Sequence, residues 1–129
     1  MQELYKFDYA IIRVVPRVER EEFINAGVIL SCQMTDYLGS KIALDEKRLK
    51  CLAPFLEIES VRDYLDVIPK ICAGEKSAGV IGSLPKRARF YWLTAVRSTI
   101  IQTSPVHSGL CKDPKSQIDG LIEKYVKLS

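Results

Sequence analysis

Residues 104–109, with the sequence SPVHSG, hold the residue types most able to do chemistry in this chain of 129 residues. They include its single histidine, His107, which lies between Ser104 and Ser108. A histidine titrates near neutral pH and can act as a general base for a hydroxyl or thiol nucleophile. We therefore take His107 and Ser104 as candidate catalytic residues. The alternative is a loop histidine that is hydrogen-bonded to backbone.

A set of arginines and glutamates forms a second candidate site, for an anion or for a partner. Arg13 lies inside an apolar strand-like run, so it must reach solvent, pair with a carboxylate or face an anion. An ion pair with a nearby glutamate and an anion site both explain it. In an enzyme, Arg13, Arg17 and Arg97 would clamp a phosphate-bearing substrate while His107 acts as base or acid. The complete set is Arg13, Arg17, Arg20, Arg97, Glu19, Glu21 and Glu22.

Basic and aromatic residues lie together in residues 86–92, KRARFYW. Lys86, Arg87 and Arg89 could grip the phosphates of a nucleic acid while the aromatic rings stack on its bases. Three aromatic residues are consecutive, however, so at least one of them must point into the core. The alternative is a basic, solvated face beside a core aromatic ring.

Asn25 and Gly27 interrupt an apolar strand-like run. A buried amide needs a hydrogen-bond partner, and a bulge in the same strand would supply one for Asn25. Gly27 indicates such a bulge, or a close approach of another backbone segment.

Signature motifs of common enzyme classes are absent from the sequence. It contains no G-x-G-x-x-G, no phosphate-binding loop, no H-E-x-x-H, no G-x-S-x-G and no EF-hand spacing. The cysteines form no close pair of the kind that zinc sites use, so we expect reduced thiols that serve mostly as small core residues. We predict no metal and no cofactor. The cysteines are Cys32, Cys51, Cys72 and Cys111.

The first third of the chain predicts an antiparallel meander. Aromatic and β-branched residues indicate strands over 5–15, 23–32 and 40–44, and Pro16 ends the first of them. The connections are too short for the crossovers that parallel strands need.

The middle of the chain predicts helices. A short helix over 46–53 follows the N-cap residue Asp45. A longer one carries an amphipathic stripe and a capping box that begins at Ser60. We expect Pro69 to kink or end this helix and Gly74 to stop it. The stripe is Val61, Leu65, Ile68 and Cys72.

The last third of the chain mixes all three element types. Residues 74–85 predict a loop, residues 98–103 a strand and residues 104–109 a turn-rich segment, whereas the pattern leaves 86–94 undecided. A final helix begins after Asp113, with a proline at its first position. Its predicted buried stripe is Ile118, Leu121, Ile122 and Tyr125.

The order of elements, strands then helices then a strand and a helix, predicts one α+β domain over 1–129. Hydrophobic residues make up 47% and charged residues 27%, which is ordinary for a globular protein. A net charge of +3 permits a phosphate-bearing partner without requiring one. We expect no signal peptide, no membrane segment and a cytoplasmic location.

Three long stretches carry a resemblance to a known family. They are YAIIRVVPRVEREEFINAGVILSC, DYLDVIPKICAGEKSAGVIGSLPKRARFYWLTAVRS and TIIQTSPVHSGLC. In this order they resemble a bacterial family catalogued as domain of unknown function 3037, over roughly residues 5–128. Glu21 departs from the family pattern R-G-E-F-x-N-x-G-V-I-L, which has glycine there, and so argues against a tight turn at this position.

The resemblance implies no established activity. It implies an accessory subunit, because genes of this family often lie beside one that encodes a HipA-like kinase-fold protein. We therefore expect a non-catalytic binding subunit that docks on a partner protein of that kind. The alternative is a small enzyme, or an anion- or nucleic-acid-binding domain, that acts on a phosphate-bearing substrate. The candidate anion or partner site is Arg13, Arg17, Glu19, Asn25, Arg97 and Ser98. The family's polar positions add Gly27, Ser104, His107 and Gly109.

Overall fold

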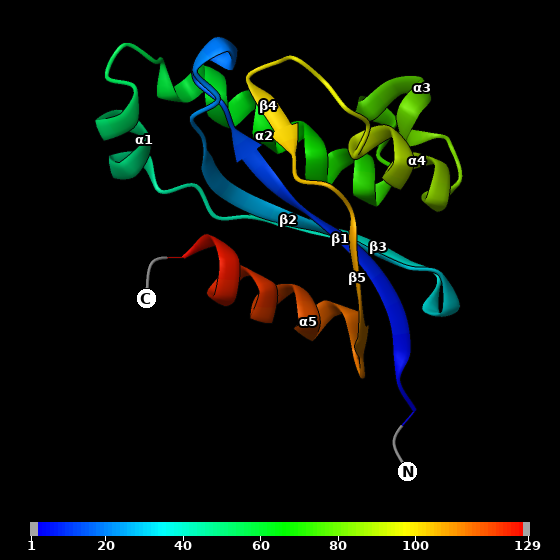
Figure 1. The fold of residues 1–129 in the computed structure, drawn as a ribbon. Coiled ribbons are helices and arrows are strands. Elements are labelled where there is room, and N and C mark those ends of the chain that lie inside the picture. The colour runs from blue at the N-terminus through cyan, green and yellow to red at the C-terminus, as the bar shows by residue number, and fades with distance from the viewer. Residues whose placement is uncertain (1–2, 128–129) are drawn as a thin grey trace.

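An antiparallel sheet of five strands separates two layers of helices in the computed structural model, which describes residues 3–127 (Figure 1). This arrangement confirms the predicted α+β class. The strands are β1 (Tyr5–Val14), β2 (Ile24–Cys32), β3 (Tyr37–Ile42), β4 (Ile101–Thr103) and β5 (His107–Cys111). The α-helices are α1 (Glu46–Leu52), α2 (Ile58–Ala73), α3 (Gly79–Gly82), α4 (Lys86–Leu93) and α5 (Pro114–Leu121). Short helical turns are η1 (Val18–Arg20), η2 (Gln33–Thr35), η3 (Lys76–Ala78) and the π-helical η4 (Ile122–Val126).

The long strand β1 lies at the centre of the sheet. Its one neighbour is β2, which in turn pairs with β3, so the predicted antiparallel meander is confirmed. On its other side β1 pairs first with β5 and then, farther along, with β4. The third strand begins at Tyr37, three residues before the predicted start, because it follows the turn η2 directly.

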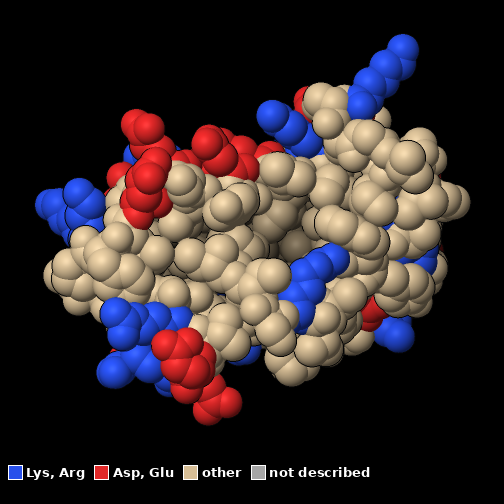
Figure 2. Space-filling model, turned by 90° about the horizontal axis from the view of Figure 1, so that it is seen from above, with Lys and Arg blue, Asp and Glu red and all other residues tan. Residues whose placement is uncertain are grey.

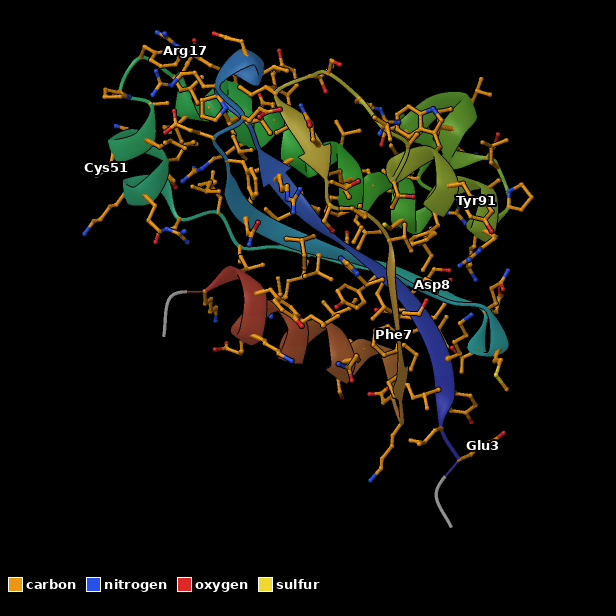
Figure 3. The ribbon with its side chains drawn as sticks, in the orientation of Figure 1. Glu3, Phe7, Asp8, Arg17, Cys51 and Tyr91 are labelled. Carbon is orange, nitrogen blue, oxygen red and sulfur yellow. The ribbon has the colours of Figure 1, made fainter. Side chains whose placement is uncertain are left out.

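Side chains of β1 alternate between two hydrophobic cores. Phe7 and Ile11 point toward α5, whereas Ile12 and Val14 point toward α2. Figure 3 shows the consecutive residues Phe7 and Asp8 on this strand. Because helices cover both faces of the sheet, the strand is apolar on both faces at its far end, as its sequence predicts.

Local caps fix the predicted helix ends in α1 and α2. Asp45 accepts a hydrogen bond from the Arg48 amide at 3.1 Å, and Gly74 ends α2 in the left-handed conformation at φ 70°. However, the N-cap of α2 is Glu57, three residues before the predicted N-cap Ser60, because Ile58 packs against the core. It also runs on through Pro69 without ending, since tertiary packing of its stripe outweighs one lost hydrogen bond.

Two predicted irregular segments are regular elements. Residues 74–85 contain η3 and α3, so the prediction of a loop is wrong. Gly82 permits close packing there, because a Cβ on it would lie 2.7 Å from the carbonyl oxygen of Glu75. Residues 107–111 form β5, so the prediction of a turn-rich segment is wrong beyond position 106. Pairing with β1, distant in sequence, satisfies its backbone.

The C-terminal helix begins as predicted, with Asp113 accepting from the Ser116 amide at 3.3 Å and Pro114 in the first turn. Its stripe is correct at three positions but not at Tyr125, which is exposed. The π-helical turn η4 widens the helix, so the buried position moves to Val126.

Cys32, Cys72 and Cys111 are buried free thiols, and Cys51 is exposed. Within residues 3–127, no helix combines the length and apolar character that a membrane crossing requires. The same part of the chain holds no group of three or more potential metal-ligating side chains.

Candidate functional site

The two serines near His107, Ser104 and Ser108, make hydrogen bonds to residues of the central strand β1. Ser104 is buried, and its hydroxyl accepts from the Ile11 amide at 2.9 Å and donates to the Pro105 carbonyl at 2.9 Å. Its proton and one of its two lone pairs are thus occupied at the break between β4 and β5. The imidazole of His107 is exposed on β5 and packs against the ring of Tyr9, with centroids 5.5 Å apart. His107 and Ser104 therefore make no nucleophile–base pair among the contacts of the described residues.

Ser108 belongs to a polar network on the opposite face of the sheet. Its hydroxyl donates to Asp8 at 2.5 Å, and Asp8 also pairs with Arg87 of α4 at 2.6 Å. Arg87 in turn donates to the hydroxyl of Ser31 at 3.0 Å and lies 4.8 Å from the ring centroid of Tyr91. Figure 3 shows Asp8 on the sheet and Tyr91 on α4 at the same end of the molecule. Burial works to raise the pKa of Asp8, but these hydrogen bonds and the charge of Arg87 hold that pKa below its usual value.

Arg13 lies on the same face of β1 as Tyr9 but does not approach His107. It is four residues from Tyr9, which is about 13 Å along a strand. Its guanidinium carbon lies 4.2 Å from the ring centroid of Phe23. Phe23 precedes β2 and lies beside the C-terminal end of β1, on the side of Arg13 away from His107. Of the two alternatives for Arg13, the ion pair with a glutamate is not formed among the described residues. The guanidinium instead makes a cation–π contact, and its buried Nε has no hydrogen-bond partner.

Arg17 and Arg97 lie at two further places. Arg17 stacks over Phe55 at 4.6 Å beside a small polar pocket that Arg20 and Glu22 share. Arg97 stacks over Trp92 at 4.4 Å on the α2 face of the sheet. Strand β1 does pair with the segment that carries His107, as an active site would require. Yet Arg97 and Arg17 line two different pockets of the described surface, and neither lining contains Arg13 or His107, so the clamp of the enzyme alternative is not assembled there.

Glu19 and Ser98 are exposed, in η1 and in the segment before β4 respectively. Asn25 has a structural task. Its amide donates to the carbonyl oxygen of Tyr125 at 2.9 Å, which ties β2 to the last turn of the C-terminal helix. The predicted bulge exists one residue before Gly27, because Ala26 is the extra residue between two paired positions. A Cβ on Gly27 would lie 2.5 Å from the carbonyl oxygen of Lys41, so the predicted close approach is confirmed as well.

The basic side chains of α4 are engaged within the molecule. Lys86 pairs with Asp36 at 2.9 Å, and Arg87 pairs with Asp8 as described. Arg89 is buried and donates to two backbone carbonyls of α2. Phe90 is the aromatic residue that points inward, as the consecutive run predicts. The proposed nucleic-acid grip therefore has no free cation among Lys86, Arg87 and Arg89.

An apolar groove of about 440 Å³ opens between α2, the end of α4 and β4. Figure 2 looks onto this side of the molecule and shows a hollow within a surface that is mostly neither acidic nor basic. We call it the α2–β4 groove. Its lining residues are Tyr64, Val67, Ile68, Ile71, Trp92, Leu93, Arg97, Thr99, Ile100, Ile101, Gln102 and Thr103.

The spacing of α2 explains why this groove is apolar. Ile68 and Ile71 belong to the buried stripe and form the floor of the groove. Tyr64 and Val67 lie one helical turn from them at the rim, where they are 56% and 45% exposed. Two large apolar side chains are thus presented to solvent beside a cavity, which is unusual for positions that serve only the core.

Arginines fix the opposite wall. Arg97 donates to the carbonyl oxygens of Leu93, at 3.1 Å, and Trp92, which satisfies the last turn of α4. Its guanidinium packs on the indole ring of Trp92, so that the ring forms a rim facing α2. Arg89 joins the start of this wall to the end of α2.

Sequence reasoning singled out Arg97 but missed Tyr64, Val67 and Trp92 as site residues. A signal existed for the first two, since both are large apolar residues outside the amphipathic stripe of their helix. For Trp92 the sequence offered a choice among three consecutive aromatic rings, which only the tertiary fold decides.

Comparison with known proteins gives one match. The family model described as "Protein of unknown function (DUF3037)" matches residues 9–126. No curated protein and no solved structure matches the chain.

Proposed function

The chain belongs to this family of proteins of unknown function, and we propose that it works as a non-catalytic binding subunit that docks on a partner protein. The α2–β4 groove is the observation that carries this proposal. An apolar groove whose rim exposes large side chains is a surface that gains free energy when a partner covers it.

The rim residues are of the kind that anchor protein interfaces. Tyrosine and tryptophan are enriched among the residues that dominate interface energetics, and here Tyr64 and Trp92 both line the groove. A further exposed apolar side chain lies just beyond α4, because Val96, next in sequence to the lining residue Arg97, is fully exposed. A protein covers such a wide surface, whereas a small molecule would fill the cavity and leave Val96 in water.

We propose a HipA-like kinase-fold protein as the partner, on the ground of the family resemblance. The domain would act as its accessory subunit. This role needs no catalytic group, which agrees with the internal hydrogen bonding of Ser104 and the separation of His107 from the arginines.

The test is a binding measurement with Val67→Glu, which places a carboxylate at the rim of the groove. Titration calorimetry with the purified kinase-fold partner should show an affinity reduced by at least about tenfold, because the interface would have to desolvate a charge. Val80→Glu is the matched control, since Val80 is an exposed valine in α3 outside the groove lining. Equal affinities of the two variants would move the docking surface elsewhere.

A further inference from the structure

We infer that the α2–β4 groove receives an amphipathic helix of the partner, one whose apolar stripe has basic residues on the side facing α2 and an acidic residue on the side facing Arg97. This inference rests on the proposed function and specifies its ligand. Three features of the described residues support it: a poor strand edge, the length of the groove and the charges along its two margins.

The edge of β4 is poorly suited to an added strand. The amide of Val15 donates to Ile100 and the amide of Ser104 donates to Ile11, so residues 100 and 104 face β1 and the outward groups belong to Ile101 and Thr103. The carbonyl oxygen of Ile101 already accepts from the hydroxyl of Thr99 at 2.8 Å. A peptide strand would find an edge of only three residues with part of its hydrogen bonding used.

The length of the groove matches a short helical contact. From Tyr64 to Ile71 the α2 wall spans seven residues, which is about 10 Å, or two helical turns. Helices that lie in grooves present anchors at positions i, i+3 or i+4, and i+7, over a similar length. Tyr64 and Trp92 line the groove and would then contact the anchor side chains of the bound helix.

An acidic row runs along the α2 margin. Glu59, Asp63 and Asp66 follow at spacings of four and three, so they lie on one face of α2, and that face adjoins Tyr64 and Val67. None of the three takes part in an ion pair within residues 3–127, and Figure 2 shows acidic side chains gathered beside the hollow. Lys70 follows on the same face at the last turn. The negative margin thus faces the first half of the groove.

The opposite margin carries the cation Arg97 beside Trp92. Two of its N–H groups are used for the carbonyls of α4, but its charge is not neutralised by a carboxylate among the described residues. A helix in the groove would therefore meet opposite charges on its two sides. This pattern selects both the sequence of the occupant and its rotation about its own axis.

The experiment uses three synthetic peptides of about 18 residues, long enough to form helix in isolation. All carry the same apolar stripe and no tryptophan, so the single tryptophan of the chain, Trp92, reports binding by its fluorescence. The first has lysines on one side of the stripe and glutamates on the other. The second has the same residues with lysines and glutamates mixed on both sides of the stripe, so that neither side carries a net charge. The third repeats the first with a central proline that breaks the helix.

We expect the first peptide to bind at least about tenfold more tightly than the other two at low ionic strength, with a smaller advantage at about 1 M salt. The double variant Asp63→Lys, Asp66→Lys should remove the advantage over the mixed peptide. Asp119→Lys, at an exposed acidic position on α5, should leave it unchanged.

Three results would overturn the inference. Equal binding of the first two peptides would show that charge does not select the occupant, and equal binding of the proline peptide would show that the occupant is extended. No change in Trp92 fluorescence up to about 1 mM peptide would exclude a helix from the groove. None of these results would touch the proposed function, which depends on the Val67→Glu measurement with the partner itself.

Discussion

Replacing Arg89 with methionine tests how the walls of the groove are held in place. Arg89 on α4 is 7% exposed, and its Nη1 donates to the carbonyl oxygens of Ile71 at 2.8 Å and Cys72 at 2.9 Å. These carbonyls belong to the last turn of α2, where intrahelical donors run out. Methionine retains the apolar stem of arginine, so the substitution removes the hydrogen bonds with little change in packing.

The magnitude follows from the partners that each carbonyl keeps. Ile71 also accepts from the Gly74 amide at 3.0 Å and keeps one bond, whereas Cys72 loses its donor. A hydrogen bond from a charged group contributes about 1.5–3 kcal/mol. Part of this loss is offset, because the substitution also removes a buried guanidinium whose Nε has no hydrogen-bond partner. We expect a net loss of about 1–2 kcal/mol in the free energy of unfolding, and a melting temperature lower by about 3–8 °C.

Urea unfolding followed by circular dichroism measures this change. Arg62→Met is the matched control, because Arg62 pairs with Glu46 on the surface, where an ion pair contributes less than about 1 kcal/mol. The reasoning would be refuted if Arg89→Met lowered the free energy of unfolding no more than Arg62→Met does. Such a result would mean that burying the guanidinium costs as much as its hydrogen bonds return.

Two further predictions concern the backbone at Glu21 and the thiol of Cys72. Glu21 adopts φ 56°, so a tight turn exists there despite the missing glycine. Glu21→Gly should raise the free energy of unfolding by about 0.5–1 kcal/mol, because left-handed backbone costs more for glutamate than for glycine. Glu19→Gly, in the regular part of η1, should lower it, and equal effects in urea titrations would contradict this account. Burial raises the pKa of Cys72 to about 11 from 9.0, although the nearby hydroxyl of Ser40 and the charge of Arg89 oppose the rise. The unfolded chain therefore loses this proton first, and the free energy of unfolding should fall by about 2–3 kcal/mol as pH rises from about 9 to about 11. Cys72→Ala should lack this part of the fall in unfolding curves measured at each pH, and an unchanged slope would show that Cys72 titrates normally.

The sequence allowed prediction of those features that local interactions decide. Asp45 and Asp113 cap helices through residues only three positions away, so a short window of sequence contains the whole interaction. The alternation in β1 is similarly local, because consecutive side chains of any strand point to opposite faces.

Features that depend on distant partners were not predictable in this way. Strand β5 has a turn-like composition, and it is a strand because β1, about a hundred residues earlier, supplies its hydrogen bonds. The shift from Tyr125 to Val126 depends on a π-helical turn, which the spacing of apolar residues does not reveal. The wall formed by Trp92 depends in turn on the packing of α4 against α2.

Three of the polar residues that attracted functional interpretation share one structural use, because they donate to carbonyl oxygens at helix ends. Arg89 serves α2 in this way, Arg97 serves α4, and Asn25 serves the last turn of the chain. Such carbonyls carry the negative end of the helix dipole, so a cation there is favourable whether or not a ligand exists. A buried or stacked arginine in this fold is therefore weak evidence for an anion site. The net charge of +3 likewise overstates the basic surface open to a nucleic acid, because several of its cations face inward. The surface that remains unexplained by the fold is the apolar one beside α2, and this is why the search for function is best directed there.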